Sequence, residues 1–168
     1  MVRARMAGRV VRIEHPNREK AESKAVRAVV VLLLLASIVL LTVITVAGWD
    51  FLQGAKVLQA LWIVVYAVLT YMVVRWSRGV LPLIAALAMI MLIFAAISVP
   101  GWFDRDATGF AQPALDADLL GLLCALLVPV QGLLILFAMR GFGQAWNVEV
   151  ERHEGDAGGG GRLAPAAA

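Results

Sequence analysis

The sequence predicts an all-α membrane protein, an antiparallel bundle of four membrane-spanning helices with both termini in the cytoplasm. Three observations lead to this prediction. The chain of 168 residues is 61% hydrophobic and only 16% charged, whereas an average soluble domain carries about 25% charged residues. Its lysines and arginines lie almost entirely on one side of the apolar runs. These charge-free runs are Ala28–Trp49, Val57–Val74, Gly79–Phe103 and Leu119–Met139.

Each apolar run has the length of a membrane-spanning helix. About 20 helical residues, at 1.5 Å per residue, cross a hydrocarbon core about 30 Å thick. The segments outside the runs are too short and too polar to form a separate core. We therefore expect one transmembrane domain over 26–140, with short connections that favour an up-down-up-down order. The expected spans are 26–48, 56–76, 80–100 and 118–140.

The first segment, residues 1–25, is strongly basic. Its composition predicts a solvated tail on the cytoplasmic side, or alternatively a segment that lies against anionic lipid headgroups. Nucleic acid is not expected as a partner, because the segment lacks the aromatic residues on which bases stack. Strong helix formers follow Pro16 without a break, so the first helix is expected to begin before it enters the membrane.

Tryptophans stand near the ends of the predicted spans. Trp49, Trp76, Trp102 and Trp146 lie where interfacial aromatic side chains usually anchor a helix to the headgroup region. The dipeptide beginning at Pro100 is expected to end the third span. The tryptophans therefore predict a belt of interfacial anchors at the two membrane surfaces.

The segment 141–168 follows the fourth span. Phe142, Trp146 and Val150 lie four residues apart, which favours a short helix along the interface. Residues 148–151 also alternate between valine and glutamate, so a strand is the alternative. The glycine- and alanine-rich residues 155–168 predict a disordered tail.

The distribution of positive charge predicts the orientation of the chain. Every lysine and arginine except Lys56 and Arg105 lies in the terminal segments, at their junctions with the first and fourth spans, or in the Arg75–Arg78 turn. Cytoplasmic loops carry such an excess in membrane proteins. Both termini are therefore expected inside the cell. The alanine-, valine- and arginine-rich composition favours the plasma membrane of a bacterium.

Three polar side chains form the first candidate site. Ser37, Tyr66 and Gln131 each lie nine or ten residues from the arginine at the end of their helix, so all three reach a similar depth near the midplane. The simpler interpretation is that they join the helices by hydrogen bonds. The functional alternative is a site for a polar substrate or ion beside a helix kink at Pro129.

Small residues form a second pattern at the start of the fourth span. Ala117, Gly121 and Ala125 lie four residues apart and therefore share one helix face. Small residues let helices approach closely in a membrane. This helix-packing face predicts either packing within the bundle or self-association between chains.

The acidic loop between the third and fourth spans is a further candidate. Paired carboxylates can bind a hard cation such as calcium, but this loop lacks the regular ligand spacing of a calcium loop. We therefore expect no metal site, with calcium binding as the alternative. The carboxylates concerned are Asp104, Asp106, Asp116 and Asp118.

The sequence also indicates which chemistries are absent. No predicted span carries an acidic, basic or histidine side chain at depth, which proton-coupled transporters and intramembrane acid–base enzymes usually need. Cys124 is the single cysteine and is expected to behave as a small apolar residue. No catalytic or nucleotide-binding motif is present. We therefore expect no enzyme, no cofactor and no metal.

The remaining function classes are structural. The leading hypothesis is a non-catalytic accessory, structural or assembly component of a membrane complex, in contact with lipid and with other membrane proteins or copies of itself. The alternative is a small oligomeric channel or carrier for an uncharged solute. An integral-membrane enzyme is a remote third option.

Overall fold

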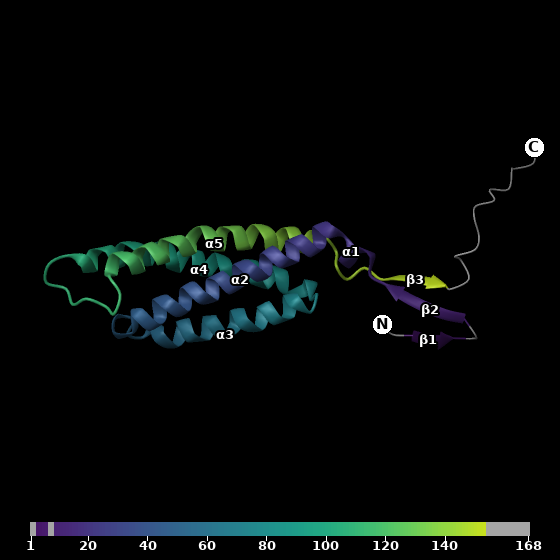
Figure 1. Cartoon of the computed structure of the whole chain (residues 1–168), viewed down its shortest axis with the longest axis horizontal. Coiled ribbons are helices and arrows are strands. Elements are labelled where there is room, and N and C mark those ends of the chain that lie inside the picture. The colour runs from purple at the N-terminus through teal and green to yellow at the C-terminus, as the bar shows by residue number, and fades with distance from the viewer. Residues whose placement is uncertain (1–2, 7–8, 154–168) are drawn as a thin grey trace, which may run out of the picture.

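Four long helices dominate the computed structural model, which describes residues 3–6 and 9–153 (Figure 1). All four are long and apolar enough to cross a membrane. They pack antiparallel as an all-α bundle, as predicted. The chain is a small multi-span membrane protein. The helices are α2 (Ala21–Ala47), α3 (Ala55–Val74), α4 (Leu81–Phe103) and α5 (Ala117–Gly143).

One difference from the predicted spans concerns the end of α4. The sequence predicts that the third span ends at Pro100, but the helix continues to Phe103. Proline removes one backbone hydrogen bond, which weakens a helix without always ending it. The extra turn carries Trp102 into the core, where its side chain is only 6% exposed. This packing accounts for the longer helix.

Short elements connect the long helices. The helix α1 (Pro16–Glu19) precedes α2, and three 3-10 turns lie at the other junctions. These turns are η1 (Trp49–Phe51), η2 (Arg78–Val80) and η3 (Asp104–Asp106). We call the end of the bundle that holds η2 and α1 the terminal end. The end that holds η1 and η3 is the loop end.

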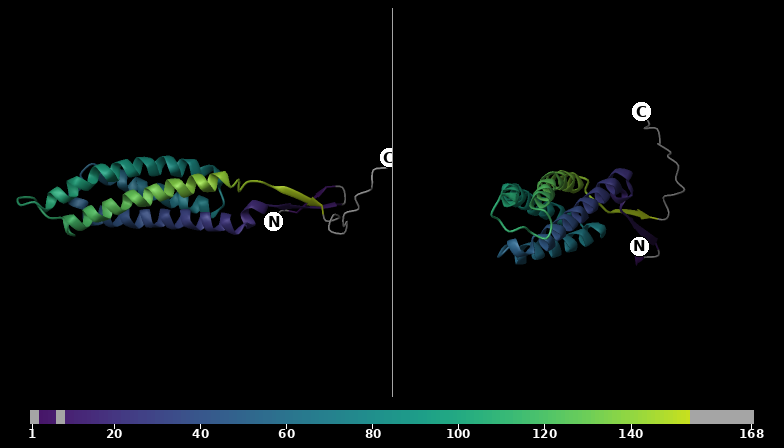
Figure 2. Two further views of the ribbon diagram at one scale, coloured as in Figure 1. Left: turned by 90° about the horizontal axis from the view of Figure 1, so that it is seen from above. Right: turned by 60° about the vertical axis from the view of Figure 1, so that its left-hand side comes forward.

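The helices pack in the spatial series α3–α2–α5–α4, and Figure 2 shows this arrangement from two further directions. Helix α2 contacts both α3 and α5, and α4 packs along α5. The remaining side of the bundle, between α3 and α4, has the least helix–helix contact. The bundle is therefore closed on three sides and looser on the fourth.

Three short strands lie beyond the terminal end, and the sequence reasoning did not predict this sheet. Its strands are β1 (Arg3–Met6), β2 (Arg9–Glu14) and β3 (Val150–His153), paired antiparallel in that order. The residue pairs Arg3 with Arg12 and Glu14 with Val150 set the register.

The sheet corrects two expectations for the terminal segments. In the first 25 residues, the described segments 3–6 and 9–14 form strands, and β-branched residues such as Val10, Val11 and Ile13 favour a strand there. Beyond α5, the structure has the strand alternative and not the interfacial helix. The predicted disordered segment 155–168 lies outside the described residues.

A regular stripe on α5 forms the centre of the bundle. Its buried residues recur every three or four positions, which is the period of one helix face. Small members of the stripe allow α4 and α5 to approach closely, as in many membrane helix pairs. The stripe consists of Leu120, Cys124, Leu127, Gln131, Leu134, Ala138 and Gly141.

Candidate functional site

The three predicted polar residues form one hydrogen-bonded chain across three helices. The Tyr66 hydroxyl of α3 donates to Gln131 Oε1 of α5 at 2.8 Å. Gln131 Nε2 donates to Ser37 Oγ of α2 at 2.8 Å, and Ser37 Oγ donates to the carbonyl of Leu33 at 2.8 Å. All three side chains are fully buried. We call this group the polar triad.

The geometry of the polar triad is that of a helix-joining group. Each polar atom of Gln131 has a partner from another helix, so the cost of burying an amide among apolar side chains is offset. Helix α5 runs without interruption through Pro129, whose side chain lies on the exposed face. The helix assignment therefore continues past the triad, and a kink at Pro129 beside a polar substrate site stays a prediction.

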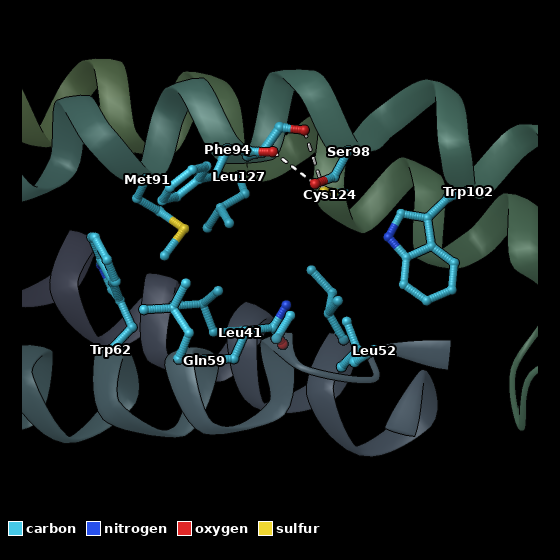
Figure 3. Close-up of a pocket in the computed structure, with 14 residues that line it drawn as sticks. Leu41, Leu52, Gln59, Trp62, Met91, Phe94, Ser98, Trp102, Cys124 and Leu127 are labelled. Carbon is cyan, nitrogen blue, oxygen red and sulfur yellow. Dashed lines mark hydrogen bonds between the residues drawn. The ribbon is translucent and has the colours of Figure 1, made fainter. Parts of the chain in front are cut away.

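A cavity of about 310 Å³ lies on the loop-end side of the triad. Figure 3 shows it between α2 and α3 on one side and α4 and α5 on the other, with Trp62 and Trp102 at its two ends. Most of its wall is apolar, and the polar side chains on it are few. The lining residues include Leu41, Ile44, Leu58, Gln59, Trp62, Met91, Phe94, Ala95, Ser98, Trp102, Cys124 and Leu127.

The polar triad forms the boundary of this cavity. Leu41, Trp62 and Leu127 line the cavity, and each lies four residues, or one helical turn, from a triad member on the same helix. The ring of Trp62 also contacts the ring of Tyr66 edge-on, with centroids 6.4 Å apart. The cavity therefore ends where the triad closes the bundle.

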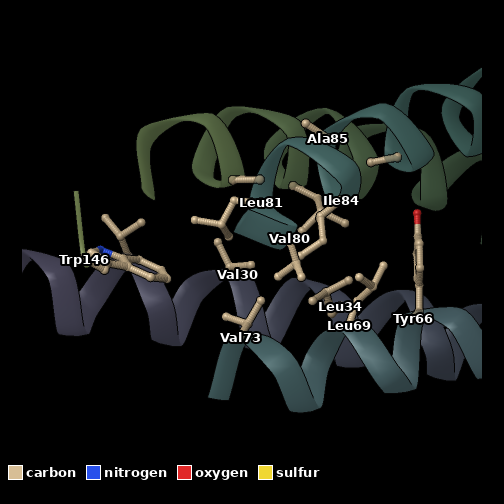
Figure 4. Packing of buried hydrophobic residues seen from close by; sticks show 14 residues of the cluster. Val30, Leu34, Tyr66, Leu69, Val73, Val80, Leu81, Ile84, Ala85 and Trp146 are labelled. Carbon is tan, nitrogen blue, oxygen red and sulfur yellow. The ribbon is translucent and has the colours of Figure 1, made fainter. Parts of the chain in front are cut away.

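The other side of the triad is tightly packed. Figure 4 shows the apolar cluster that fills the bundle from Tyr66 to Trp146. Val30, Leu34 and Ile84 within it are fully buried. We call this part of the bundle the closed half and the part that contains the cavity the hollow half. The polar triad separates the two halves.

The cavity reaches the outer surface of the bundle between α3 and α4. Two of its lining residues, Leu58 of α3 and Phe94 of α4, are 44% and 47% exposed. Trp62 and Phe94 bridge the two helices there, with ring centroids 6.4 Å apart. Because this is the side with the least helix–helix contact, the cavity has a lateral opening toward the surroundings of the bundle.

Trp102 closes the loop end of the cavity and packs on Gly48. A Cβ atom at position 48 would lie 2.5 Å from the Trp102 ring. Only glycine therefore lets the end of α2 approach this ring without a shift. The sequence position of Trp102 predicts an interfacial anchor, but its ring lies inside the protein.

The other predicted anchors lie in different environments. Trp49 is 50% exposed, with Lys56 Nζ 4.7 Å from its ring centroid, as an interfacial residue would be. Trp146 is fully buried and therefore cannot anchor the chain to headgroups. Trp76 is partly buried and contacts Trp146 edge-on, with centroids 5.3 Å apart. The anchor assignment is corrected for Trp102 and Trp146, because protein side chains cover both rings.

Arginines join the helix ends around this tryptophan pair. The Arg27 guanidinium lies 4.1 Å from the Trp76 ring centroid. Arg78 Nε donates to the carbonyl of Phe142 at 2.7 Å, and Arg78 Nη1 donates to Asn147 Oδ1 at 2.9 Å. These contacts connect the α3–α4 turn to the end of α5. They close the bundle at its terminal end.

The small-residue face at the start of α5 packs within the chain. Ala117 and Gly121 are buried, and Ala125 is partly buried. A Cβ at Gly121 would lie 3.1 Å from the ring of Phe103 on α4. Cys124 is also buried, and its thiol lies 3.5 Å from the carbonyl oxygen of Ala95. These contacts are internal and favour packing in the bundle over self-association through this face.

The acidic loop shows no sign of a metal centre. Within the described residues, no three histidine, cysteine or acidic side chains come together at a distance suited to a metal ion. Asp116 precedes α5 at its N-cap position, and its side chain makes no capping hydrogen bond. The loop therefore offers separate carboxylates and no cluster of ligands.

The sequence reasoning missed the cavity. Its residues come from four helices and share no motif, and apolar periodicity cannot show whether facing side chains fill the space between them. One weak signal was present: the lining residues Ala95 and Ser98 of α4 and Cys124 of α5 all have small side chains.

No protein-family model matches the chain, and no curated protein or solved structure matches it significantly. The fold and the site therefore define only the class: a small multi-span membrane protein with four apolar helices. Any more specific function is argued from its own residues.

Proposed function

We propose that the chain is a non-catalytic membrane protein that acts through contacts inside the bilayer, as an accessory or assembly component of a membrane complex. One observation carries this proposal. Only 17% of the apolar stretch of α3 is buried within the chain, against 33% to 39% in the other three helices. Helix α3 therefore presents the largest apolar surface that a partner helix could cover. Its exposed residues include Val57, Leu61, Val64, Val68 and Tyr71.

The polar triad supports this proposal over a channel. A channel or carrier for an uncharged solute needs polar groups that face a pathway, and the triad groups instead face one another and are buried. The cavity wall is mostly apolar and adjoins the triad. In this account, the triad holds α2, α3 and α5 together and the outer face of α3 meets the partner.

A photo-crosslinking amino acid at Val64, on the exposed face of α3, tests the proposal in intact membranes. We expect an adduct with a second polypeptide. The matched control is the same amino acid at Leu136, an exposed apolar position on α5, where we expect lipid adducts alone. If position 64 also gives lipid adducts alone, the proposed role of α3 is wrong.

We further propose that the terminal end faces the cytoplasm of a bacterial cell. Arg18, Arg27, Arg75, Arg78 and Arg140 all lie at this end, and a positive excess is typical of the cytoplasmic side. Reporter fusions at position 149 and in the turn between α3 and α4 should both report the cytoplasm. A fusion in the loop around position 110 should report the opposite side. Reversed or mixed results would contradict this orientation.

A further inference from the structure

We propose that the cavity of the hollow half holds one acyl chain of an anionic phospholipid, whose phosphate lies beside Arg105 at the loop end. The proposal rests on the membrane setting that the four apolar helices establish. It does not depend on the outer face of α3 meeting a partner. The two proposals can therefore fail independently.

The size and lining of the cavity suit a hydrocarbon chain. Its volume of about 310 Å³ lies at the lower end of the roughly 300–1,000 Å³ typical of ligand sites. It is about twice the 150 Å³ apolar cavity known to take up one benzene molecule. Leu41, Met91 and Leu127 form apolar walls along it (Figure 3). A single chain would fill this space without burying a polar group.

The position of the opening favours a lipid over a water-soluble ligand. Leu58 and Phe94 line the cavity and are also exposed on the outer face of the bundle, between α3 and α4. Ser98 on the same rim is exposed, and its hydroxyl already donates to the carbonyl of Phe94. A ligand that enters between these helices comes from the hydrocarbon core of the bilayer, which consists mainly of the acyl chains of lipids.

The charges at the loop end favour an anionic headgroup. The Arg105 guanidinium lies 5.6 Å from the ring centroid of Trp102, which closes the cavity, and 4.9 Å from that of Phe51. Lys56 Nζ lies 4.7 Å from the ring centroid of Trp49, which does not line the cavity. Arg105 is therefore the loop-end cation that lies beside the cavity wall, although the surrounding loops are rich in aspartate.

Within the described residues, neither cation forms a close ion pair with those aspartates. Across residues 3–6 and 9–153, no carboxylate lies within 4.0 Å of Arg105 or Lys56. At the terminal end, by contrast, Arg140 pairs with Glu22 at 2.6 Å. Unpaired basic groups beside a lateral pocket are the usual protein partners of a phospholipid phosphate. The phosphate of a zwitterionic lipid is balanced by its own headgroup cation, whereas the phosphate of an anionic lipid has no such counter-charge. We therefore assign an anionic lipid beside Arg105.

The direct test uses the full chain in vesicles of equal parts phosphatidylglycerol and phosphatidylcholine with identical acyl chains. After extraction in mild detergent, native mass spectrometry counts the lipids that each chain retains. We expect one retained phosphatidylglycerol per chain, with about tenfold preference over phosphatidylcholine. Equal retention of the two lipids, or retention of neither, would overturn the proposal.

A pair of variants on α4 tests whether the lipid lies in the cavity. Ala95→Phe places a ring in the cavity, whereas Ala96→Phe adds the same ring on the exposed face of the same helix. We expect Ala95→Phe to lower lipid retention about tenfold and Ala96→Phe to leave it unchanged. If Ala95→Phe does not fold, Ser98→Phe at the exposed rim replaces it. Unchanged retention in the folded cavity variant would place the lipid elsewhere.

A second pair tests the headgroup. Arg105→Gln removes the charge beside the cavity, and Arg75→Gln removes an exposed arginine at the other end of the bundle. We expect Arg105→Gln to retain one lipid but to lose the preference for phosphatidylglycerol, while Arg75→Gln keeps it. An unchanged preference in Arg105→Gln would contradict the assignment of the phosphate.

Discussion

The two halves of the bundle are built from the same four helices but differ in how completely side chains fill them. In the closed half, Leu34, Tyr66 and Ile84 are fully buried and arginines join the helix ends. In the hollow half, an apolar cavity of about 310 Å³ remains between the helices. The polar triad lies at the boundary. The difference shows that helices of similar apolar composition can pack tightly at one end of a bundle and leave a cavity at the other.

The largest expected effect comes from the same truncation made in each half. Leu34 and Leu41 lie two turns apart on α2, and both side chains are buried. The test replaces each of them with alanine. Leu34→Ala opens a new void in a filled region, which typically costs about 2–4 kcal/mol of unfolding free energy. Leu41 borders an existing cavity and has fewer contacts to lose, so about 1–2 kcal/mol is expected. Steric trapping in bicelles measures the unfolding free energy of both variants. An equal or larger loss of unfolding free energy in Leu41→Ala would contradict the distinction between the halves.

The arginines at the two ends provide the next comparison. Arg78 donates hydrogen bonds to Phe142 and Asn147. Within the part of the chain that the structure describes, the Arg105 side chain contacts the rings of Phe51 and Trp102 and forms no hydrogen bond. Arg78→Ala should therefore lower the unfolding free energy by about 1–2 kcal/mol. Arg105→Ala should lower it by less than about 1 kcal/mol in lipid-free detergent. The same unfolding assay measures the unfolding free energies of the two variants. Similar losses of unfolding free energy would mean that the Arg78 hydrogen bonds do not stabilise the terminal end.

A double-mutant cycle measures the coupling energy of a hydrogen bond in the polar triad, at the boundary between the halves. Ser37→Ala and Gln131→Leu remove the two partners of one interhelical hydrogen bond. We expect a coupling energy of about 0.5–2 kcal/mol, the range found for such bonds in membranes. The cycle uses unfolding free energies of the two single variants and the double variant. Additive effects would show that the triad does not join α2 to α5.

The smallest effect is expected from two glycines of α5. A Cβ at Gly141 would lie 3.1 Å from the Trp146 ring and 3.2 Å from Leu81, whereas one at Gly132 would meet nothing within 4 Å. Gly132→Ala should be neutral or stabilise by up to about 1 kcal/mol through helix propensity. Gly141→Ala should be about 1 kcal/mol less favourable than Gly132→Ala, because the closed half has no room for the methyl group. Equal shifts in thermal unfolding temperature would argue against tight packing there.

The sequence predicts those features that depend on length and periodicity. The four charge-free runs locate the ends of α2 to α5 to within about four residues, except that α2 begins seven residues before its run. The thickness of the bilayer core sets the length of an apolar helix. The equal spacing of Ser37, Tyr66 and Gln131 from the helix-end arginines identifies side chains that the fold brings together. Orientation relative to the membrane stays a prediction.

Features that depend on side-chain volume or on long-range pairing are not predicted. Trp102 and Trp146 have the sequence positions of interfacial anchors, and only the packed structure places their rings inside the protein. The pairing of β2 with β3 joins segments more than a hundred residues apart, which local patterns cannot specify. The cavity follows from how the packed side chains fit together, which the order of residues does not reveal.

Hydrophobic carbene footprinting on the wild-type chain in vesicles tests the division into two halves most directly. A small apolar diazirine partitions into the bilayer and, after photolysis, inserts into side chains that it can reach. Met91 and Leu127 line the cavity, whereas Ile84 and Leu134 are equally well buried in the closed half. We predict adducts at Met91 and Leu127 and none above background at Ile84 and Leu134. Equal labelling of the two pairs would contradict a cavity that opens to the bilayer from one half alone.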